Sequence, residues 1–228
     1  MTQPPRLKQL ARETLWDRAY AALELALLAG RYAPGERILL RDVADALGIS
    51  LTPVRDAVNR LVAENILDRG SVGQGGGATV PLLDADQFGQ LMTIRSGLEP
   101  VAAAAATLHA TPEALEPVAA ALHEMKDAVE TQRLDRYLDA HYRFHFGIYR
   151  MSRMPIVEQA IENAWLRCAP TLTLALPRNI PGLKRYPFHE AALGALRRGD
   201  ADSAAEAIRA DIESARADIC ALLDDAAA

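Results

Sequence analysis

The sequence predicts a mostly α-helical protein of two units, the first of which also contains a small β-hairpin. Apolar residues recur at three- and four-residue steps over most of the 228-residue chain, which is the periodicity of amphipathic helices. Glycines and prolines divide this pattern into separate helices. Residues 1–81 carry 10 basic and 9 acidic side chains, whereas the remainder carries 15 and 21. We therefore expect three helices and a hairpin in residues 1–81 and an all-helical bundle in residues 82–228.

The composition excludes several classes of protein. With 50% hydrophobic and 24% charged residues, the chain can bury a core. Its two cysteines, Cys168 and Cys220, lie far apart, which excludes a disulfide scaffold and a cysteine-only zinc module. No apolar stretch reaches the ~20 residues that cross a bilayer, and the amino terminus lacks the apolar core of a secretory signal. We expect a soluble, cytoplasmic protein with no membrane partner.

Three helices are expected in the first unit. The first extends over about residues 13–30, where leucine and alanine recur at helical spacing. The second is the short segment LRDVADALG, which ends at Gly48. The third is expected to begin with Thr52 as its N-cap and Pro53 as its first helical residue. Only three residues would then separate Gly48 from that cap.

A hairpin should follow the third helix, and then a second series of helices. Residues 66–67 and 78–80 are apolar and flank a glycine-rich tip, which predicts two short strands. Residues 81–86 are expected to be a linker. Beyond it, five or six helices fit between residues 84 and 225, with residues 177–187 as the longest loop. The expected breaks between helices fall mainly at Pro112, Gly182 and Gly199.

Two helices joined by a short turn containing glycine are typical of a helix-turn-helix, whose second helix enters the major groove of DNA. The amino-terminal end of the third helix offers Ser50, Thr52, Arg55 and Asn59 on one side. Arg55 could bond to guanine, and the two hydroxyls could hold phosphates. Gln74 and Gly75 at the hairpin tip could approach the DNA backbone or minor groove. The alternative is an ordinary helical hairpin with a solvated polar face.

The segment LRDVADALGISLTPVRDAVNRLVAENIL, with its glycine-tipped hairpin, resembles the winged helix-turn-helix of GntR-family bacterial transcription regulators. The resemblance implies that residues 1–81 form a DNA-binding domain in which Arg41, Ser50, Arg55, Gln74 and Gly75 contact DNA. We expect a homodimer that reads a palindromic operator in double-stranded DNA and acts as a repressor or an activator. Leu51 departs from the family, since that position is often basic.

Ionisable side chains occur on helix faces that should be buried in the second unit. His141 and His145 lie one turn apart on an otherwise apolar stripe, so their imidazoles can meet at one point. His189 and Asp211 interrupt apolar stripes of two later helices. Together the four would suit a divalent transition metal, with zinc favoured and nickel, manganese or iron as alternatives to it, rather than calcium. Alternatively, each histidine is a satisfied core residue and Asp211 pairs with an arginine.

Three segments, IRSGLEPVAAAAA, HYRFHFGIYRMS and FHEAALGALRRGDADSAAEAIRADI, resemble the FCD effector domain, the all-helical partner found in one subgroup of the GntR family. The resemblance implies that residues 82–228 form an effector domain that binds metal. Metal-binding members use an aspartate and three histidines, and those positions here hold His141, His145, His189 and Asp211. The aspartate and the last histidine have changed places, which retains three histidines and one carboxylate.

Arg95 lies on an inward stripe of the first helix of this second unit, where an unpaired cation would be costly. Either Glu99 or the carboxylate of a small organic acid could balance it. In the second case Arg95 would orient an effector.

The sequence therefore predicts a DNA-binding regulator, not an enzyme, whose operator affinity is controlled by a small carboxylate effector at a metal site. Two alternatives apply to the second unit. The first is a metal-dependent hydrolytic enzyme in which the His/Asp cluster activates water. The second is a metal-free effector domain that binds an apolar ligand among its helices.

Overall fold

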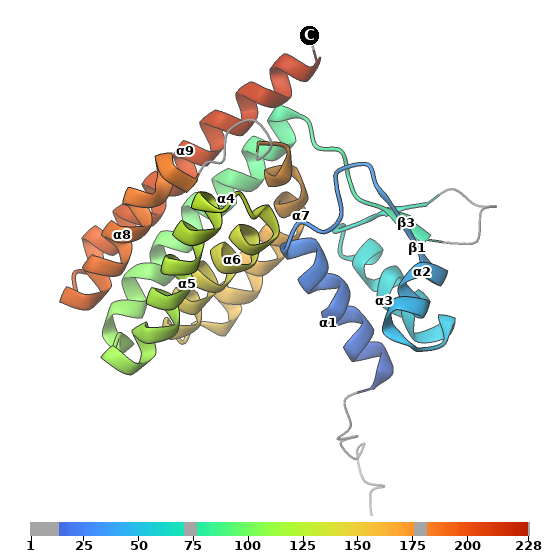
Figure 1. The fold of residues 1–228 in the computed structure, drawn as a ribbon, viewed down its shortest axis with the longest axis horizontal. Helices are drawn as coiled ribbons and strands as arrows, with labels where there is room; N and C mark the ends of the chain where they lie inside the picture. The colour runs from blue at the N-terminus through green and yellow to red at the C-terminus, as the bar shows by residue number, and fades with distance from the viewer. Residues whose placement is uncertain (1–13, 71–76, 176–181, 228) are drawn as a thin grey trace, which may run out of the picture.

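The amino-terminal unit is built on three short helices with distinct ends. The computed structural model describes residues 14–70, 77–175 and 182–227 (Figure 1). Helix α1 (Leu15–Leu28) starts at Thr14, whose hydroxyl accepts a hydrogen bond from the Asp17 amide while the Asp17 carboxylate accepts one from Thr14. Helix α2 (Leu40–Leu47) ends at Gly48 in the left-handed conformation. Helix α3 (Leu51–Ala63) follows directly.

The start of α3 differs from the prediction. Its N-cap is Ser50 rather than Thr52, so the helix begins at Leu51 and Pro53 is its third residue. Proline is tolerated there because its missing N–H would have no partner within the helix in the first turn. The earlier start leaves a turn of only three residues after α2.

A small antiparallel sheet joins the two ends of this unit. Strand β3 (Gly77–Thr79) lies between β1 (Arg37–Leu39) and β2 (Asp68–Arg69). The expected hairpin of β2 and β3 is therefore present, with β2 two residues later than predicted. Strand β1 is an addition that the sequence pattern did not reveal. It places the segment before α2 beside the hairpin, where Ile38 and Ala78 are buried opposite each other.

Six α-helices form the carboxy-terminal unit in the described residues, which agrees with the expected mostly α fold. Pro112 and Gly199 mark helix boundaries as predicted, and Gly182 is the first residue of α8. The expected loop over residues 177–187 is too long at its carboxy end, because Pro187 lies inside α8. The elements are α4 (Ala85–Ala106), α5 (Pro112–Glu130), α6 (Leu134–Met151), α7 (Pro155–Leu172), α8 (Gly182–Arg198) and α9 (Ala201–Ala227), with 3-10 turns η1 (Thr107–His109) and η2 (Thr173–Ala175).

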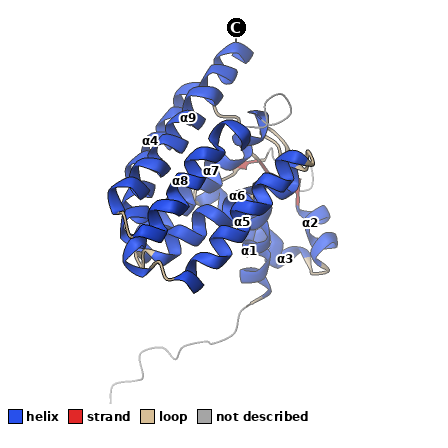
Figure 2. Ribbon diagram, turned by 60° about the vertical axis from the view of Figure 1, so that its left-hand side comes forward, coloured by secondary structure: helices blue, strands red, loops and turns tan. Residues whose placement is uncertain are grey.

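Long helix pairs organise this bundle. Helix α4 packs along α9, α5 along α6, and α8 along α9, so that the interior faces of α6, α8 and α9 meet (Figures 1 and 2). Helix α1 packs on α3 and also on α7, and it thereby joins the two units. Among the described helices, none is long and apolar enough to cross a membrane.

Candidate metal centre and nucleic-acid interface

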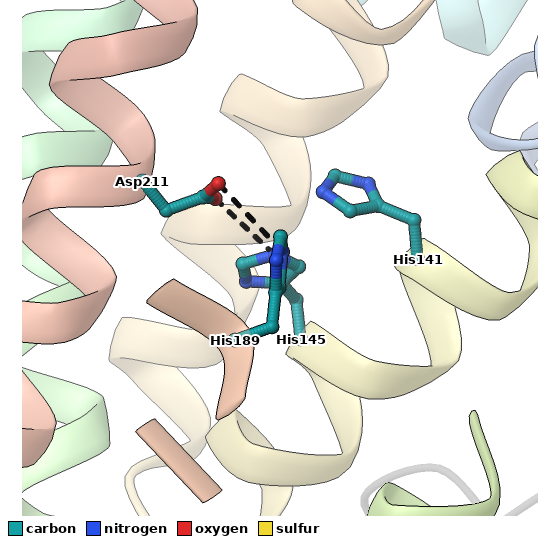
Figure 3. A group of neighbouring side chains, drawn as sticks. All are labelled: His141, His145, His189 and Asp211. Atoms are coloured by element: carbon teal, nitrogen blue, oxygen red, sulfur yellow. Dashed lines mark hydrogen bonds and ion pairs between the residues drawn. The ribbon is translucent and has the colours of Figure 1, made fainter. Parts of the chain in front are cut away.

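Four ionisable side chains from three helices converge inside the bundle. His141 and His145 come from successive turns of α6, His189 from α8 and Asp211 from α9 (Figure 3). All four are buried, and one potential ligand atom from each lies within 4.8 Å of the others. The four residues predicted from the sequence are thus brought together, although they lie 70 positions apart at the extremes.

The hydrogen bonds of two imidazoles fix which nitrogen faces the cluster. The Nδ1 atom of His189 lies 3.0 Å from the carbonyl oxygen of Arg185, which only accepts, so Nδ1 carries the proton. The Nδ1 atom of His145 lies 2.9 Å from the Tyr149 hydroxyl, which donates to Glu99 and therefore accepts from His145. Both Nε2 atoms are left with lone pairs, and they lie 3.2 Å apart. Two facing lone pairs repel unless a cation lies near both.

Asp211 adds a carboxylate to these lone pairs without a compensating hydrogen bond. Its Oδ2 lies 3.5 Å from Nε2 of His145, and its Oδ1 lies 3.7 Å from Nε2 of His189. Oδ1 is buried and has no hydrogen-bond partner in the described structure. A buried carboxylate oxygen in this state is unfavourable unless it is coordinated. The orphaned oxygen and the converging nitrogens therefore fit a bound cation.

Burial favours the metal-binding form of two of the histidines. Burial, together with neighbouring positive charge and other imidazoles, holds the pKa of His141 and His145 well below its usual value. Both rings are therefore neutral and able to coordinate. Three imidazoles and one carboxylate are a donor set that suits first-row transition metals better than calcium or magnesium.

A network of buried hydrogen bonds around Glu99 adjoins this cluster and contacts it at His145. The Glu99 carboxylate accepts hydrogen bonds from Arg95 at 2.6 Å, from the Tyr149 hydroxyl at 2.5 Å and from the Trp165 indole at 2.7 Å. Tyr149 connects this carboxylate to Nδ1 of His145. Neither Tyr149 nor Trp165 was singled out in the sequence. Tyr149 lies four residues after His145 on the same helix face, but an aromatic residue on an inward face is ordinary and gives no signal that would single it out.

Arg95 has the protein's own carboxylate as its partner. It is 2% exposed, both Nε and Nη2 bond to Glu99, and its guanidinium stacks 4.2 Å from the Trp165 ring centroid. Its Nη1 faces the sulfur atoms of Met92 and Cys168. Of the two partners expected from the sequence, the internal one is present. The effector role of Arg95 stays a prediction, and its guanidinium is already occupied.

The candidate DNA-reading face lies on α2 and α3. The side chains of Val54, Ala57, Val58 and Leu61 are buried in the unit's core. The predicted contacts are exposed on the other side: Arg41, Ser50, Thr52, Arg55 and Asn59. Leu51, also exposed, stands among them at the start of α3. Gln74 and Gly75 lie outside the described residues.

Comparison with known families matches both units. Residues 15–80 match the bacterial regulatory proteins of the gntR family, and residues 90–214 match the FCD domain. Residues of this chain are 35% identical to the HTH-type transcriptional regulator McbR of Escherichia coli K12 over 150 residues. That alignment spans 66% of each chain, so about a third of the relative is unmatched.

Solved structures give the same assignment over a longer stretch. The E. coli McbR/YncC structure superposes with a TM-score of 0.83 at 28% identity and covers 95% of this chain and 100% of its own. A putative transcriptional regulator GntR from Rhodococcus sp. RHA1 superposes with a TM-score of 0.73, covering 90% of this chain and 97% of its own. At 19% identity, this second likeness shows the fold alone. These relatives and domains are regulators rather than enzymes, and the chain belongs to the FCD-domain subgroup of GntR-family transcription regulators.

Proposed function

We propose that this regulator binds a palindromic operator as a homodimer and that a small organic acid, held at a metal in the FCD domain, controls its affinity for DNA. The convergence of four buried ligand atoms within 4.8 Å carries the proposal. Because bacterial operators lie in the cytoplasm, the protein would act there. Arg41, Ser50, Thr52, Arg55 and Asn59 would contact DNA, with Gln74 and Gly75 assigned from the family resemblance alone.

The exposed amino-terminal end of α3 carries some side chains suited to base edges and others suited to phosphates. Arg55 and Asn59 are side chains that form paired hydrogen bonds with guanine and adenine edges. Ser50 and Thr52, at the amino end of the helix, would hold phosphate oxygens together with the backbone amides of the first turn. Leu51 is 37% exposed and offers only apolar surface, which suits the methyl group of thymine.

An apolar stripe on α4 and η1 supports a homodimer. Ile94, Val101 and Leu108 are 47%, 51% and 80% exposed, and they follow one another at seven-residue spacing. That spacing keeps the three side chains near one face of the helix, and a symmetric partner could cover that face with its own copy. Val101→Glu would then convert the dimer to a monomer in analytical ultracentrifugation and abolish tight operator binding.

The cluster supplies four protein ligands, and this number bears on the choice of metal. A bound divalent cation would supply a Lewis-acidic position for an effector carboxylate. Zinc in structural sites has four ligands, so four protein ligands would fill it unless it expands to five. A cation that prefers six ligands retains open positions. A carboxylate effector thus favours nickel, manganese or iron, or zinc in an expanded shell.

Metal analysis tests the centre directly. Protein purified without added metal should contain about one transition-metal ion per chain, and the double variant His141→Ala/His145→Ala should contain none. His123→Ala is the control, since that histidine side chain is 75% exposed on α5. If native protein remains metal-free after incubation with each candidate ion, the metal-based control is wrong and a metal-free apolar site becomes the better explanation.

A selection from random double-stranded DNA tests the proposed DNA-binding domain. The native protein should enrich one palindrome with two half-sites about one helical turn apart. Arg55→Ala should lose preference at one position in each half-site, whereas Arg197→Ala, on the exposed end of α8, should enrich the same palindrome as the native protein. Failure to enrich any palindrome would contradict the proposed operator.

A further inference from the structure

Arg185 is a buried cation whose hydrogen-bonding groups are not satisfied. The residue lies in the first turn of α8 and is 7% exposed. Its Nε and Nη2 atoms have no hydrogen-bond partner in the described part of the chain. A guanidinium has five N–H donors, and leaving buried donors unpaired destabilises the folded protein. Such a side chain is normally retained only where something else bonds to it.

The ion pair available to Arg185 is a weak one. Its Nη2 lies 3.8 Å from Oδ2 of Asp218, beyond hydrogen-bonding distance, and the Asp218 side chain is one-third exposed. This geometry contrasts with Arg95, whose Nε lies 2.6 Å from the fully buried Glu99. Arg95 and Arg185, the two buried arginines among the described residues of the bundle, therefore differ in kind. Arg95 is already paired, and Arg185 has donors to spare.

The positive charge of Arg185 acts on two residues of α6. This charge contributes to the lowered pKa of His141, after the larger effects of burial, of His189 and of Arg95. It also opposes the rise that burial causes in the pKa of Tyr137, one turn before His141. The positive charge of Arg185, on α8, therefore acts on side chains of α6 as well as of α9.

One helical turn separates Arg185 from the cluster. Its carbonyl oxygen accepts the Nδ1–H bond of His189, four residues further along α8. Four residues rise ~6 Å along a helix. The backbone of Arg185 therefore lies about one turn from that of His189. If its guanidinium keeps a similar separation from a carboxylate bound at the centre, dicarboxylic acids of about four to six carbons can span the two positions.

We infer that Arg185 is the second anchor for the effector, and that the effector is a short dicarboxylate with one carboxyl group at the metal centre and the other on the Arg185 guanidinium. This inference rests on the proposed metal-bound carboxylate and names its chemical class. The planar guanidinium pairs with a carboxylate through two parallel hydrogen bonds, which would satisfy the unpaired donors. This inference also places the effector anchor at Arg185 on α8 rather than at Arg95 on α4.

Calorimetry and thermal-shift measurements on metal-loaded protein test the inference that the effector is a dicarboxylate. The ligands are malonate, succinate, glutarate and adipate, and each is compared with the monocarboxylate of equal length. One dicarboxylate should bind at least tenfold more tightly than its monocarboxylate. In Arg185→Met that advantage should disappear, a loss of about 10- to 100-fold, because a charge-assisted hydrogen bond is worth ~1.5–3 kcal/mol. Metal content and monocarboxylate affinity should not change. Arg185→Lys should recover part of the advantage, and Arg197→Met on the same helix should match the native protein.

Thermal stability without ligand separates an anchor from a structural residue. Because Arg185→Met removes unpaired buried donors, the melting temperature of the ligand-free variant should equal or exceed that of the native protein. A large fall would mean that Arg185 serves the fold, and would overturn the inference. So would equal affinity for mono- and dicarboxylates, or an undiminished dicarboxylate advantage in Arg185→Met. In each of these cases metal and monocarboxylate binding would survive, whereas failure of the proposed function would remove both.

Discussion

At the scale of single residues, the least satisfied group in the His/Asp cluster is the Oδ1 atom of Asp211, buried and without a hydrogen bond among the described residues. In Asp211→Asn the side chain keeps its shape but loses its charge. We expect unchanged or higher thermal stability without metal, since a buried carboxylate is costly. We also expect the rise in melting temperature on metal addition to be lost, because one ligand is gone. Differential scanning fluorimetry with and without metal measures both.

Asp224→Asn, near the exposed end of α9, is the matched control and should keep the metal response. The assignment of Asp211 as a ligand would be contradicted by a variant that unfolds more easily without metal yet retains its full stabilisation by metal. That outcome would make Asp211 a structural acceptor for the neighbouring imidazoles.

Leu51 provides a prediction about a single methyl group. If Leu51 contacts thymine, replacing that thymine by deoxyuridine in each half-site should weaken operator binding of the native protein several-fold, because only the methyl group is removed. Leu51→Ala should bind the two DNAs about equally. Fluorescence anisotropy with both DNAs and both proteins measures the coupling. Equal sensitivity of the two proteins to the methyl group would exclude this contact.

The four residues of the cluster could be predicted from the sequence, but the residues that support the cluster could not. His141, His145 and Asp211 were recognisable because polar residues on an apolar stripe need a reason. Tyr149 and Trp165 gave no such signal, since aromatic residues are ordinary on an inward face. Their roles depend on Glu99 reaching both of them from α4, and this contact between distant segments has no local sequence pattern.

At the scale of elements, the helices were predictable and the short strand was not. Apolar periodicity over ten or more residues identified the long helices of the bundle. Strand β1 has three residues and joins α2 without a break, so no alternation can develop in it. It exists because β3 pairs with it across the sheet. Pro187 had the opposite effect: the prediction placed it at the carboxy end of a loop, whereas it lies early in α8.

Gly30 is the point where the end of α1 meets the FCD domain. Its φ angle is +62°, and a Cβ atom there would lie 2.6 Å from both Leu138 Cδ1 on α6 and Thr173 Cγ2 in η2. Leu138 is one turn before His141 on the same helix. We expect Gly30→Ala to destabilise the protein and to weaken the effect of the metal-bound effector on DNA affinity, because α1 and α6 must move apart.

Gly199→Ala is the matched control for this prediction. Its φ angle of +66° imposes the same backbone strain, but no atom lies within 4 Å of the added Cβ. It should lose ~1 kcal/mol of stability from that strain and keep the full response of DNA binding to effector. Chemical denaturation and operator titrations measure the two effects. Equal behaviour of both variants would show that the contact at Gly30 does not couple the units.

At the scale of the whole molecule, the two units meet across acidic side chains. A cleft of about 270 Å³ is lined by Tyr20, Glu24, Arg60 and Glu64 on one side and by Glu162 on α7 on the other. The Tyr20 hydroxyl donates to Glu64, which also pairs with Arg60. Arg60 is thus committed to Glu64, and Glu24 and Glu162 face the cleft together.

This arrangement makes the docking of the two units sensitive to pH. Burial, with the nearby Glu162 and Glu64 carboxylates, raises the pKa of Glu24 from 4.5 to about 7. Between these values the folded protein binds a proton that the unfolded chain has released, so stability falls as pH rises towards 7. Above about pH 7 the ionised carboxylate is repelled by Glu162, and the docked arrangement is least favoured.

Glu24→Gln should therefore be more stable than the native protein above about pH 7, and this advantage should shrink as the pH falls towards 4.5. The neutral amide keeps the size of the side chain without the charge. Thermal unfolding across this pH range measures the difference, and Glu116→Gln, exposed on α5, should follow the native profile. The packing of α1 on α7 would set the distance between the two DNA-binding domains of the dimer. In that case the operator affinity of Glu24→Gln should also lose its pH dependence near pH 7. A constant stability difference at every pH would mean that Glu24 is ionised throughout and that its charge does not control docking.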